Sequence, residues 1–121
     1  DVTSPIVTDE WAVGTAYDIT WAVTGIVTNV KIEYSKDGGT NYTETLVATL
    51  PYDQSPYSWT IPSDKDILST QGVIRVADAS YAAANGESAE FSVIGFITVN
   101  APVTSDILHV GDAFDIQWNA I

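Results

Sequence analysis

Hydrophobic and polar residues alternate along most of this chain, which is typical of β-strands that bury one face. In residues 30–35, the apolar side chains of Val30, Ile32 and Tyr34 alternate with polar ones. Residues 16–23 show the same alternation. The pattern also predicts strands over residues 42–50, 57–61, 73–78 and 88–93. The chain is therefore expected to be built almost entirely of β-strands.

The segments between the predicted strands carry turn signals. Residues 36–39, Lys-Asp-Gly-Gly, predict a tight turn because glycine tolerates positive φ. Ser63, with Asp66 three residues later, is typical of a helix N-cap, so we expect one short helical turn over residues 63–69. Short strands at 10–15-residue spacing, with turns between them, favour an all-β, antiparallel β-sandwich.

The first 24 residues of the sequence are repeated near its end. Residues 1–24 align without gaps on residues 98–121 at a constant offset of 97, and nine of the 24 positions are identical. The identical pairs are Val2/Val99, Pro5/Pro102, Asp9/Asp106, Val13/Val110, Gly14/Gly111, Ala16/Ala113, Asp18/Asp115, Ile19/Ile116 and Trp21/Trp118. Such a period indicates tandem modules. It also matches the roughly 100 residues of an immunoglobulin-like sandwich.

The repeat divides the chain into two parts. Residues 1–95 are predicted to form one complete module, and residues 96–121 the first two strands of a second copy. The second stretch is too short to build its own core. It must pack on the first module, pair with another chain, or lack the rest of its own module. Phe96 and Ile97, in the linker, are the predicted apolar contacts between modules.

Five motifs in order resemble a known family. They are Trp11-x-Val13-Gly14-x4-Ile19-x-Trp21, residues 30–39, Tyr57-x-Trp59-x-Ile61-Pro62, Ile74-Arg75-Val76-x-Asp78, and Ser88-x-x-Phe91. This order is similar to the immunoglobulin-like module at the N-terminus of Ser/Thr-rich, glycolipid-anchored fungal wall proteins. That module recurs in tandem in secreted bacterial and archaeal proteins. The resemblance implies a sandwich of about seven strands, an extracellular or cell-surface location and no recognised catalytic set.

Composition excludes several classes of function. The net charge is −12, from 16 acidic residues against four basic ones, so nucleic acid is not an expected partner. No apolar run reaches 18 residues, so insertion into a membrane is not expected either. The chain has no cysteine, and His109 is its one histidine. A catalytic triad or a His/Cys metal site therefore cannot be assembled, and we expect no enzymatic activity and no cofactor other than calcium.

Three features are candidate sites. Asp9 and Asp106 recur near the edge of each module, so the hypothesis is that they bind a calcium ion that stiffens the junction. Asn41 begins an Asn-Tyr-Thr glycosylation sequon on a predicted hairpin. Tyrosines in or near loops could form a sugar-binding platform, namely Tyr42, Tyr52, Tyr57 and Tyr81. The tryptophans of the predicted strands are instead expected in the core, namely Trp21, Trp59 and Trp118.

These observations favour a non-catalytic structural repeat of an extracellular or cell-surface protein. It would act as a stalk, filament, surface-layer or adhesin spacer, and could assemble through its incomplete second module. The expected partners are neighbouring modules of the same or another copy of the chain, or surface glycans and proteins. The alternative is a carbohydrate- or protein-binding accessory module of a secreted enzyme.

Overall fold

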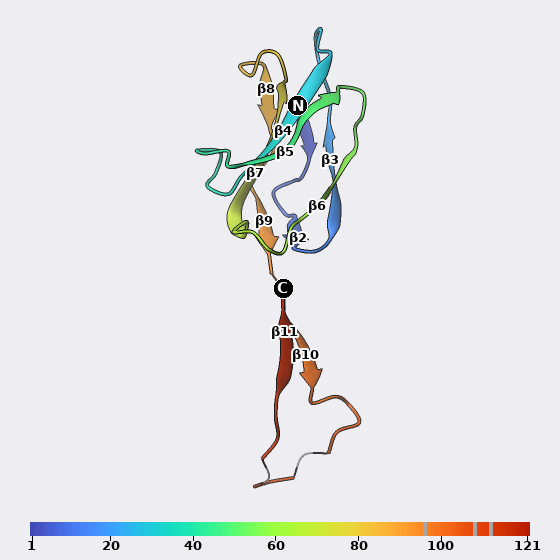
Figure 1. Ribbon diagram of the computed structural model, residues 1–121, viewed down its shortest axis with the longest axis vertical. Helices are drawn as coiled ribbons and strands as arrows, with labels where there is room; N and C mark the ends of the chain where they lie inside the picture. The colour runs from blue at the N-terminus through green and yellow to red at the C-terminus, as the bar shows by residue number, and fades with distance from the viewer. Residues whose placement is uncertain (96, 108, 112) are drawn as a thin grey trace.

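The computed structural model describes residues 1–95, 97–107, 109–111 and 113–121. These residues form eleven strands and no helix (Figure 1). The strands are β1 (Val2–Ser4), β2 (Glu10–Ala12), β3 (Ala16–Trp21), β4 (Asn29–Ser35), β5 (Glu44–Pro51), β6 (Tyr57–Thr60), β7 (Ser69–Asp78), β8 (Asn85–Glu87), β9 (Phe91–Ile94), β10 (Ile97–Ala101) and β11 (Gln117–Ala120).

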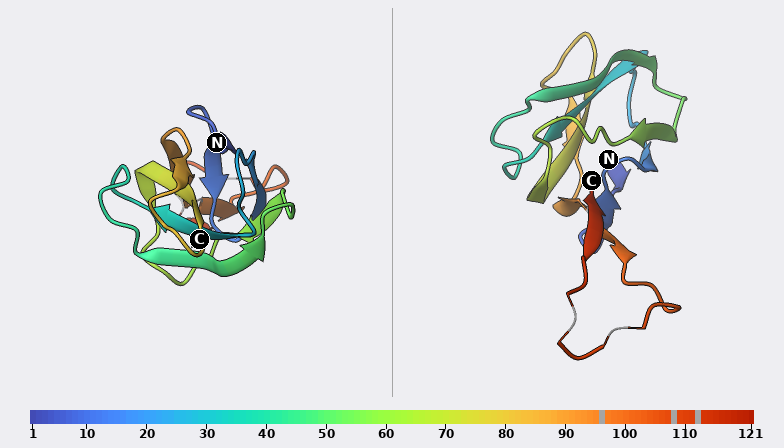
Figure 2. Two further views of the ribbon diagram at one scale, coloured as in Figure 1. Left: turned by 90° about the horizontal axis from the view of Figure 1, so that it is seen from above. Right: turned by 60° about the horizontal axis from the view of Figure 1, so that its bottom comes forward.

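The strands form three sheets. One sheet has the order β1-β3-β6, and a larger one has the order β2-β9-β7-β4-β5, with β8 also paired to β7. Pairing is antiparallel except between β2 and β9, which run parallel. The third sheet is the β10–β11 hairpin, which extends away from the body formed by residues 1–95 (Figures 1 and 2).

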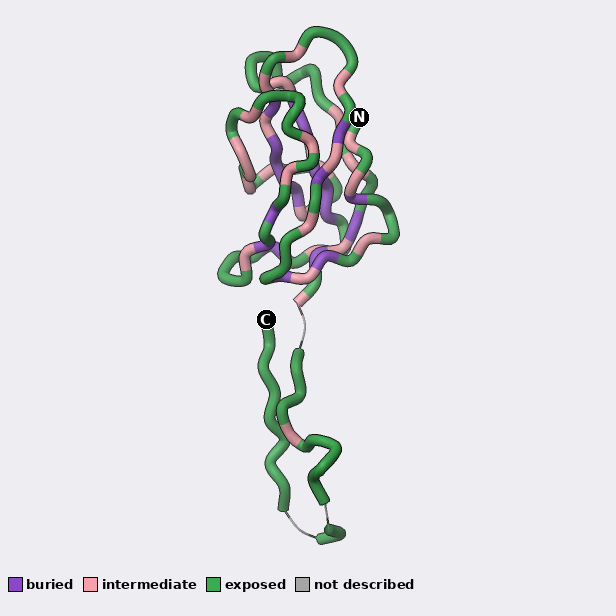
Figure 3. The backbone as a smooth tube through the Cα atoms, turned by 90° about the vertical axis from the view of Figure 1, so that its right-hand side faces the viewer, coloured by how far each residue is buried: buried purple, intermediate pink, exposed green. Residues whose placement is uncertain are grey.

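The first two sheets share one hydrophobic core, which follows from the alternation in the sequence. Ile19 and Trp59 enter it from the smaller sheet, and Ile32, Tyr34 and Phe91 enter it from the larger one. The rings of Tyr34 and Trp59 meet across the sheets at 5.4 Å. The Tyr34 hydroxyl donates to the Ile67 carbonyl oxygen at 2.9 Å, so the buried phenol is satisfied. Buried positions are concentrated inside this body (Figure 3).

The body contains more strands than the seven expected from the sequence. Two short strands, β1 and β2, precede the first strand whose range was predicted, because a turn at residues 6–9 lets β1 pair with β3 and β2 cross to β9. β8 is a further short strand in a segment expected to be a loop. The additional strands therefore lie at sheet edges and leave the predicted core strands in place.

The helical turn expected over residues 63–69 is wrong. Residues 63–66 form bends, and the Ile67 amide donates to the Lys65 carbonyl oxygen at 2.9 Å. Lys65 pairs with Glu44 at 2.8 Å, and Ile67 is fully buried. These tertiary contacts hold the segment against the body, and so override a weak capping signal that only one turn of helix could use.

The turn after β4 forms as expected. An Asp37 carboxylate oxygen accepts hydrogen bonds from the Ser35 hydroxyl at 2.7 Å and the Asn41 amide at 2.8 Å. Gly38 and Gly39 both adopt positive φ. The Ser35 hydroxyl and the Asn41 amide groups lower the pKa of Asp37 to about 2, because they stabilise its ionised form.

Candidate functional site

The strongest candidate for function is the second repeat, because its backbone reproduces the first. In the body, Val2 pairs with Trp21 and Ser4 with Thr20, with a register shift between the two pairs. In the hairpin, Val99 pairs with Trp118 and Ala101 with Gln117, with a shift at the same place. Each residue is displaced by the same 97 positions, so the repeat extends from sequence to strand register.

The turn after the first strand of each repeat is also reproduced. The Asp9 carboxylate accepts a hydrogen bond from the Ile6 amide at 3.0 Å, and the Asp106 carboxylate accepts one from the Val103 amide at 2.8 Å. These hydrogen bonds account for the recurrence of both aspartates without an ion.

The structure does not bring the two aspartates together. Asp9 lies just before β2, and Asp106 lies in the β10–β11 connection at the far end of the hairpin (Figure 1). Among the described residues, no group of three or more His, Cys, Asp or Glu side chains could hold a metal ion.

Burial distinguishes the two copies sharply. Trp21 is 7% exposed and Ile19 fully buried, whereas Trp118 is 60% and Ile116 63% exposed. Val110, the counterpart of the buried Val13, is fully exposed. The residues that build the core of the first repeat therefore face solvent in the second.

Four exposed residues of the β10–β11 hairpin form one apolar surface, the hairpin apolar face. It comprises Ile97, Val99, Trp118 and Ala120, which share one side of the hairpin because facing residues pair across it. Neither β10 nor β11 contains a charged residue, although the chain as a whole has a net charge of −12. Exposed, uncharged strand pairs with apolar side chains are typical of interaction surfaces in proteins.

The junction between the two parts requires a glycine at position 95. A Cβ atom at Gly95 would collide with the Ile121 carbonyl oxygen, and the Leu68 side chain lies nearby. Ile121 also approaches Gly14, at the same end of the body. Of the two predicted contact residues, Ile97 is exposed and paired with Ala120, and Phe96 lies outside the described residues.

A charged network on the outer face of the larger sheet was not found from the sequence. The Glu33 side chain is buried between Lys31 and Arg75, and Arg75 donates to it at 2.6 Å. Burial opposes ionisation of Glu33, but these two cations hold its pKa below the usual value. Arg75 also stacks on Tyr42, whose hydroxyl donates to Glu87 at 2.6 Å. The cross-strand register places Arg75 opposite both Glu33 and Glu87, and a single sequence does not show this register.

The predicted tyrosine platform is divided among different environments. Tyr42 belongs to the charged network, where burial and the Glu87 carboxylate raise its pKa. Tyr57 is half-buried in β6 and packs against the core. Tyr52 and Tyr81 are exposed in two different connections, after β5 and after β7.

The sequon asparagine takes part in the turn after β4. Asn41 is exposed, and its Nδ2 atom, which would carry a glycan, donates to the Asp37 carboxylate at 2.8 Å. This nitrogen carries two hydrogens, so a glycan that replaced the other one would leave the turn contact in place.

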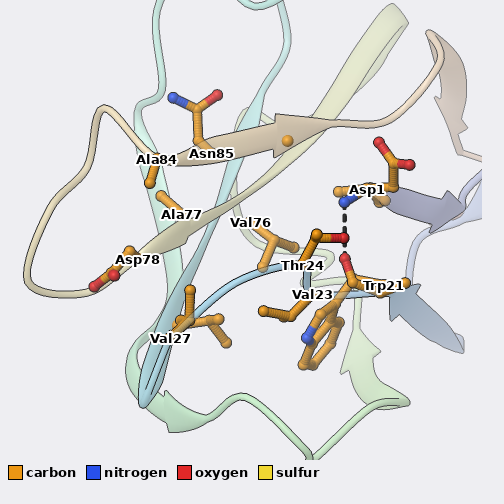
Figure 4. Close-up of a pocket in the computed structure, with 14 residues that line it drawn as sticks. Asp1, Trp21, Val23, Thr24, Val27, Val76, Ala77, Asp78, Ala84 and Asn85 are labelled. Atoms are coloured by element: carbon orange, nitrogen blue, oxygen red, sulfur yellow. Dashed lines mark hydrogen bonds between the residues drawn. The ribbon is translucent and has the colours of Figure 1, made fainter.

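A pocket of about 200 Å³ opens at the end of the body that carries the first residue. Trp21, Val27 and Val76 line it, and the Asp1 backbone nitrogen donates to the Ala22 carbonyl oxygen at its edge at 2.8 Å (Figure 4). Its lining is mostly apolar side chains and backbone, and its polar residues are Asp1, Thr24, Asp78 and Asn85.

No helix among the described residues is long and apolar enough to cross a membrane. Comparisons with protein-family models, curated proteins and solved structures found no match to this chain.

Proposed function

We propose that this chain is a non-catalytic structural repeat of an extracellular or cell-surface protein, in which successive modules extend a stalk, filament or surface layer. The observation that carries the proposal is the shared register of β1–β3 and β10–β11. A second copy that repeats the strand pairing, the turn and the apolar positions of the first begins a second module of the same kind.

We further propose that each module is an immunoglobulin-like β-sandwich. In that fold, the first, second and fifth strands share one sheet, and the third, sixth and seventh share the other. The smaller sheet, β1-β3-β6, and the central run β9-β7-β4 follow this order once β5 is taken as an additional edge strand. Each of the five sequence motifs that resemble the family includes residues of one of the strands β3, β4, β6, β7 and β9.

The proposed mechanism is packing between neighbours. Each module buries its own core, and the close approach of Gly95 and Ile121 sets how the next module leaves the body. Acidic side chains spread over the body keep an extended array soluble through mutual repulsion.

Small-angle X-ray scattering on chains lengthened to two and three complete copies tests this proposal. A structural spacer should increase in maximum dimension by an equal step with each copy, and should bind nothing on a glycan array. Scattering that shows a compact particle without a constant step would contradict the spacer role. Specific glycan binding would favour the accessory binding module instead.

Assembly through the second repeat is the second candidate, and the exposed hairpin apolar face favours it. A strand partner from another chain could cover this face, as in β-strand addition.

A further inference from the structure

Each end of the body carries an exposed aliphatic side chain that the core does not use. Leu68 precedes β7 and is 53% exposed, although its neighbour Ile67 is fully buried. Ile26, in the connection between β3 and β4, is fully exposed. The two connections lie at opposite ends of the body, and the β10–β11 hairpin leaves from the end that carries Leu68 (Figure 1). Both residues belong to the first module, and its own strands leave them exposed.

The second repeat shows what lies against the Leu68 end. A Cβ atom added at Gly95 would meet the Ile121 carbonyl oxygen, and it would lie 3.9 Å from the Leu68 Cδ1 atom. A Cβ atom added at Gly14 would lie 3.9 Å from the Ile121 Cγ2 atom. Gly14, Leu68 and Gly95 come from three separate segments of the body, after β2, before β7 and after β9. Together they border the space that Ile121 enters.

The 97-residue offset relates this contact to the opposite end of a module. Ile121 is the counterpart of Thr24, which lies two residues before Ile26 in the connection between β3 and β4. Two residues of backbone span at most about 7 Å. In a second module, the counterpart of Ile26 therefore lies within reach of the Leu68 end, because the counterpart of Thr24 already contacts it.

We propose that the Leu68 end of each module is the docking surface for the β3–β4 connection of the next copy, whose Ile26 packs on Leu68 and Gly14. The contact joins two different surfaces of the same module, so it can repeat along an array without closing into a ring. It is apolar on both sides, and so brings no acidic side chains together in a protein of net charge −12. This inference rests on the proposed tandem repeat and names the surfaces through which its modules pack.

The first half of the test uses the present chain, with residual dipolar couplings to measure the orientation of the hairpin relative to the body. Leu68→Ser should change the couplings of the hairpin, because Ile121 loses an apolar neighbour. It should leave the unfolding midpoint of the body unchanged, because the side chain is exposed. Ile26→Ser is the matched control. It removes an aliphatic side chain from the opposite end and should leave the hairpin couplings unchanged.

The second half uses a chain in which a copy of residues 25–95 follows Ile121. Its two modules should align as one body in the natural form. Leu68→Ser in the first module and Ile26→Ser in the appended copy should each abolish this common alignment. The double variant should lose no more than either single variant, because both remove the same contact. Ile26→Ser in the first module, which faces no junction, is again the control.

Three results would overturn the inference. The first is a set of hairpin couplings that Leu68→Ser does not change. The second is a loss of common alignment with Ile26→Ser in the first module that equals the loss with the same change in the appended copy. The third is an effect of the double variant equal to the sum of two partial effects. Lengthened chains that increase in maximum dimension by equal steps, while these variants have no effect, would leave the structural repeat intact and remove the docking contact alone.

Discussion

The two copies of the repeated segment show that the same sequence pattern can have opposite consequences. Residues 2–21 and 99–118 share their strand register, their turn hydrogen bond and a positive-φ glycine. Yet the first copy contributes to a core, and the second presents the same apolar residues to solvent. Local pairing is thus encoded within the segment itself, whereas burial depends on strands that follow it in the chain.

Truncating the shared tryptophan should give the largest contrast between the copies. Trp21→Ala should lower the free energy of unfolding by about 3–5 kcal/mol, because it opens a cavity and leaves the Tyr52 carbonyl oxygen without its donor. Trp118→Ala should change it by less than about 0.5 kcal/mol. Urea denaturation measures both. If Trp21→Ala fails to fold, Trp21→Phe is the milder variant to use. Equal losses of unfolding free energy at positions 21 and 118 would contradict this prediction.

The shared glycine should show a smaller contrast. Gly14 and Gly111 have φ of 78° and 86°. Alanine in this region costs about 1–2 kcal/mol, so Gly14→Ala should destabilise the body by that amount. Gly111→Ala should leave the same thermal unfolding transition unchanged, because the hairpin adds nothing to the core. A shift of that transition by Gly111→Ala would show that the two parts unfold together.

The stability of the body should decrease at acid pH because Asp37 becomes protonated. Its lowered pKa means that its ionised form stabilises the fold above pH 4, and that this contribution is lost as pH falls toward about 2. Asp37→Asn should therefore be less stable than the natural chain at pH 6, and the difference should shrink near pH 2. Thermal melts across this range test it, with Asp53→Asn, at an exposed position, as the control. A difference that does not change with pH would remove the electrostatic explanation.

Gly95→Ala should have the smallest effect on stability and a clear effect on orientation. The added methyl group meets the Ile121 carbonyl oxygen, so the hairpin must move relative to the body while the unfolding midpoint stays within error. Residual dipolar couplings measure the change in orientation. In a chain that lacks Ile121, Gly95→Ala should leave the orientation of the hairpin unchanged. An equal change in orientation in that chain would show that the linker, and not the contact with Ile121, causes it.

The sequence predicted the elements whose signal is local. Alternation located the strands that carry Ile32, Tyr34 and Phe91, and the glycine turn after β4 formed as expected. The helical turn over residues 63–69 failed because burial of Ile67 and the Lys65–Glu44 pair outweighed a short capping signal.

Among the site residues, the sequence located the repeat but could not show which copy would be buried. Trp118 was expected in a core because it repeats Trp21, yet it lies on the surface of the described structure. The network around Glu33 could not be predicted either, since it depends on the register that places Arg75 opposite Glu33. Both gaps arise from long-range pairing, which a local pattern does not contain.

The central claim is that residues 97–121 begin a second module whose core is completed by strands of the same kind. Hydrogen exchange on a chain in which a copy of residues 25–95 follows Ile121 tests it most directly. The account predicts that the amides of Ile116 and Trp118 exchange fast in the present chain. In the lengthened chain they should become as protected as those of Ile19 and Trp21. Persistent fast exchange at Ile116 and Trp118 in the lengthened chain would contradict it.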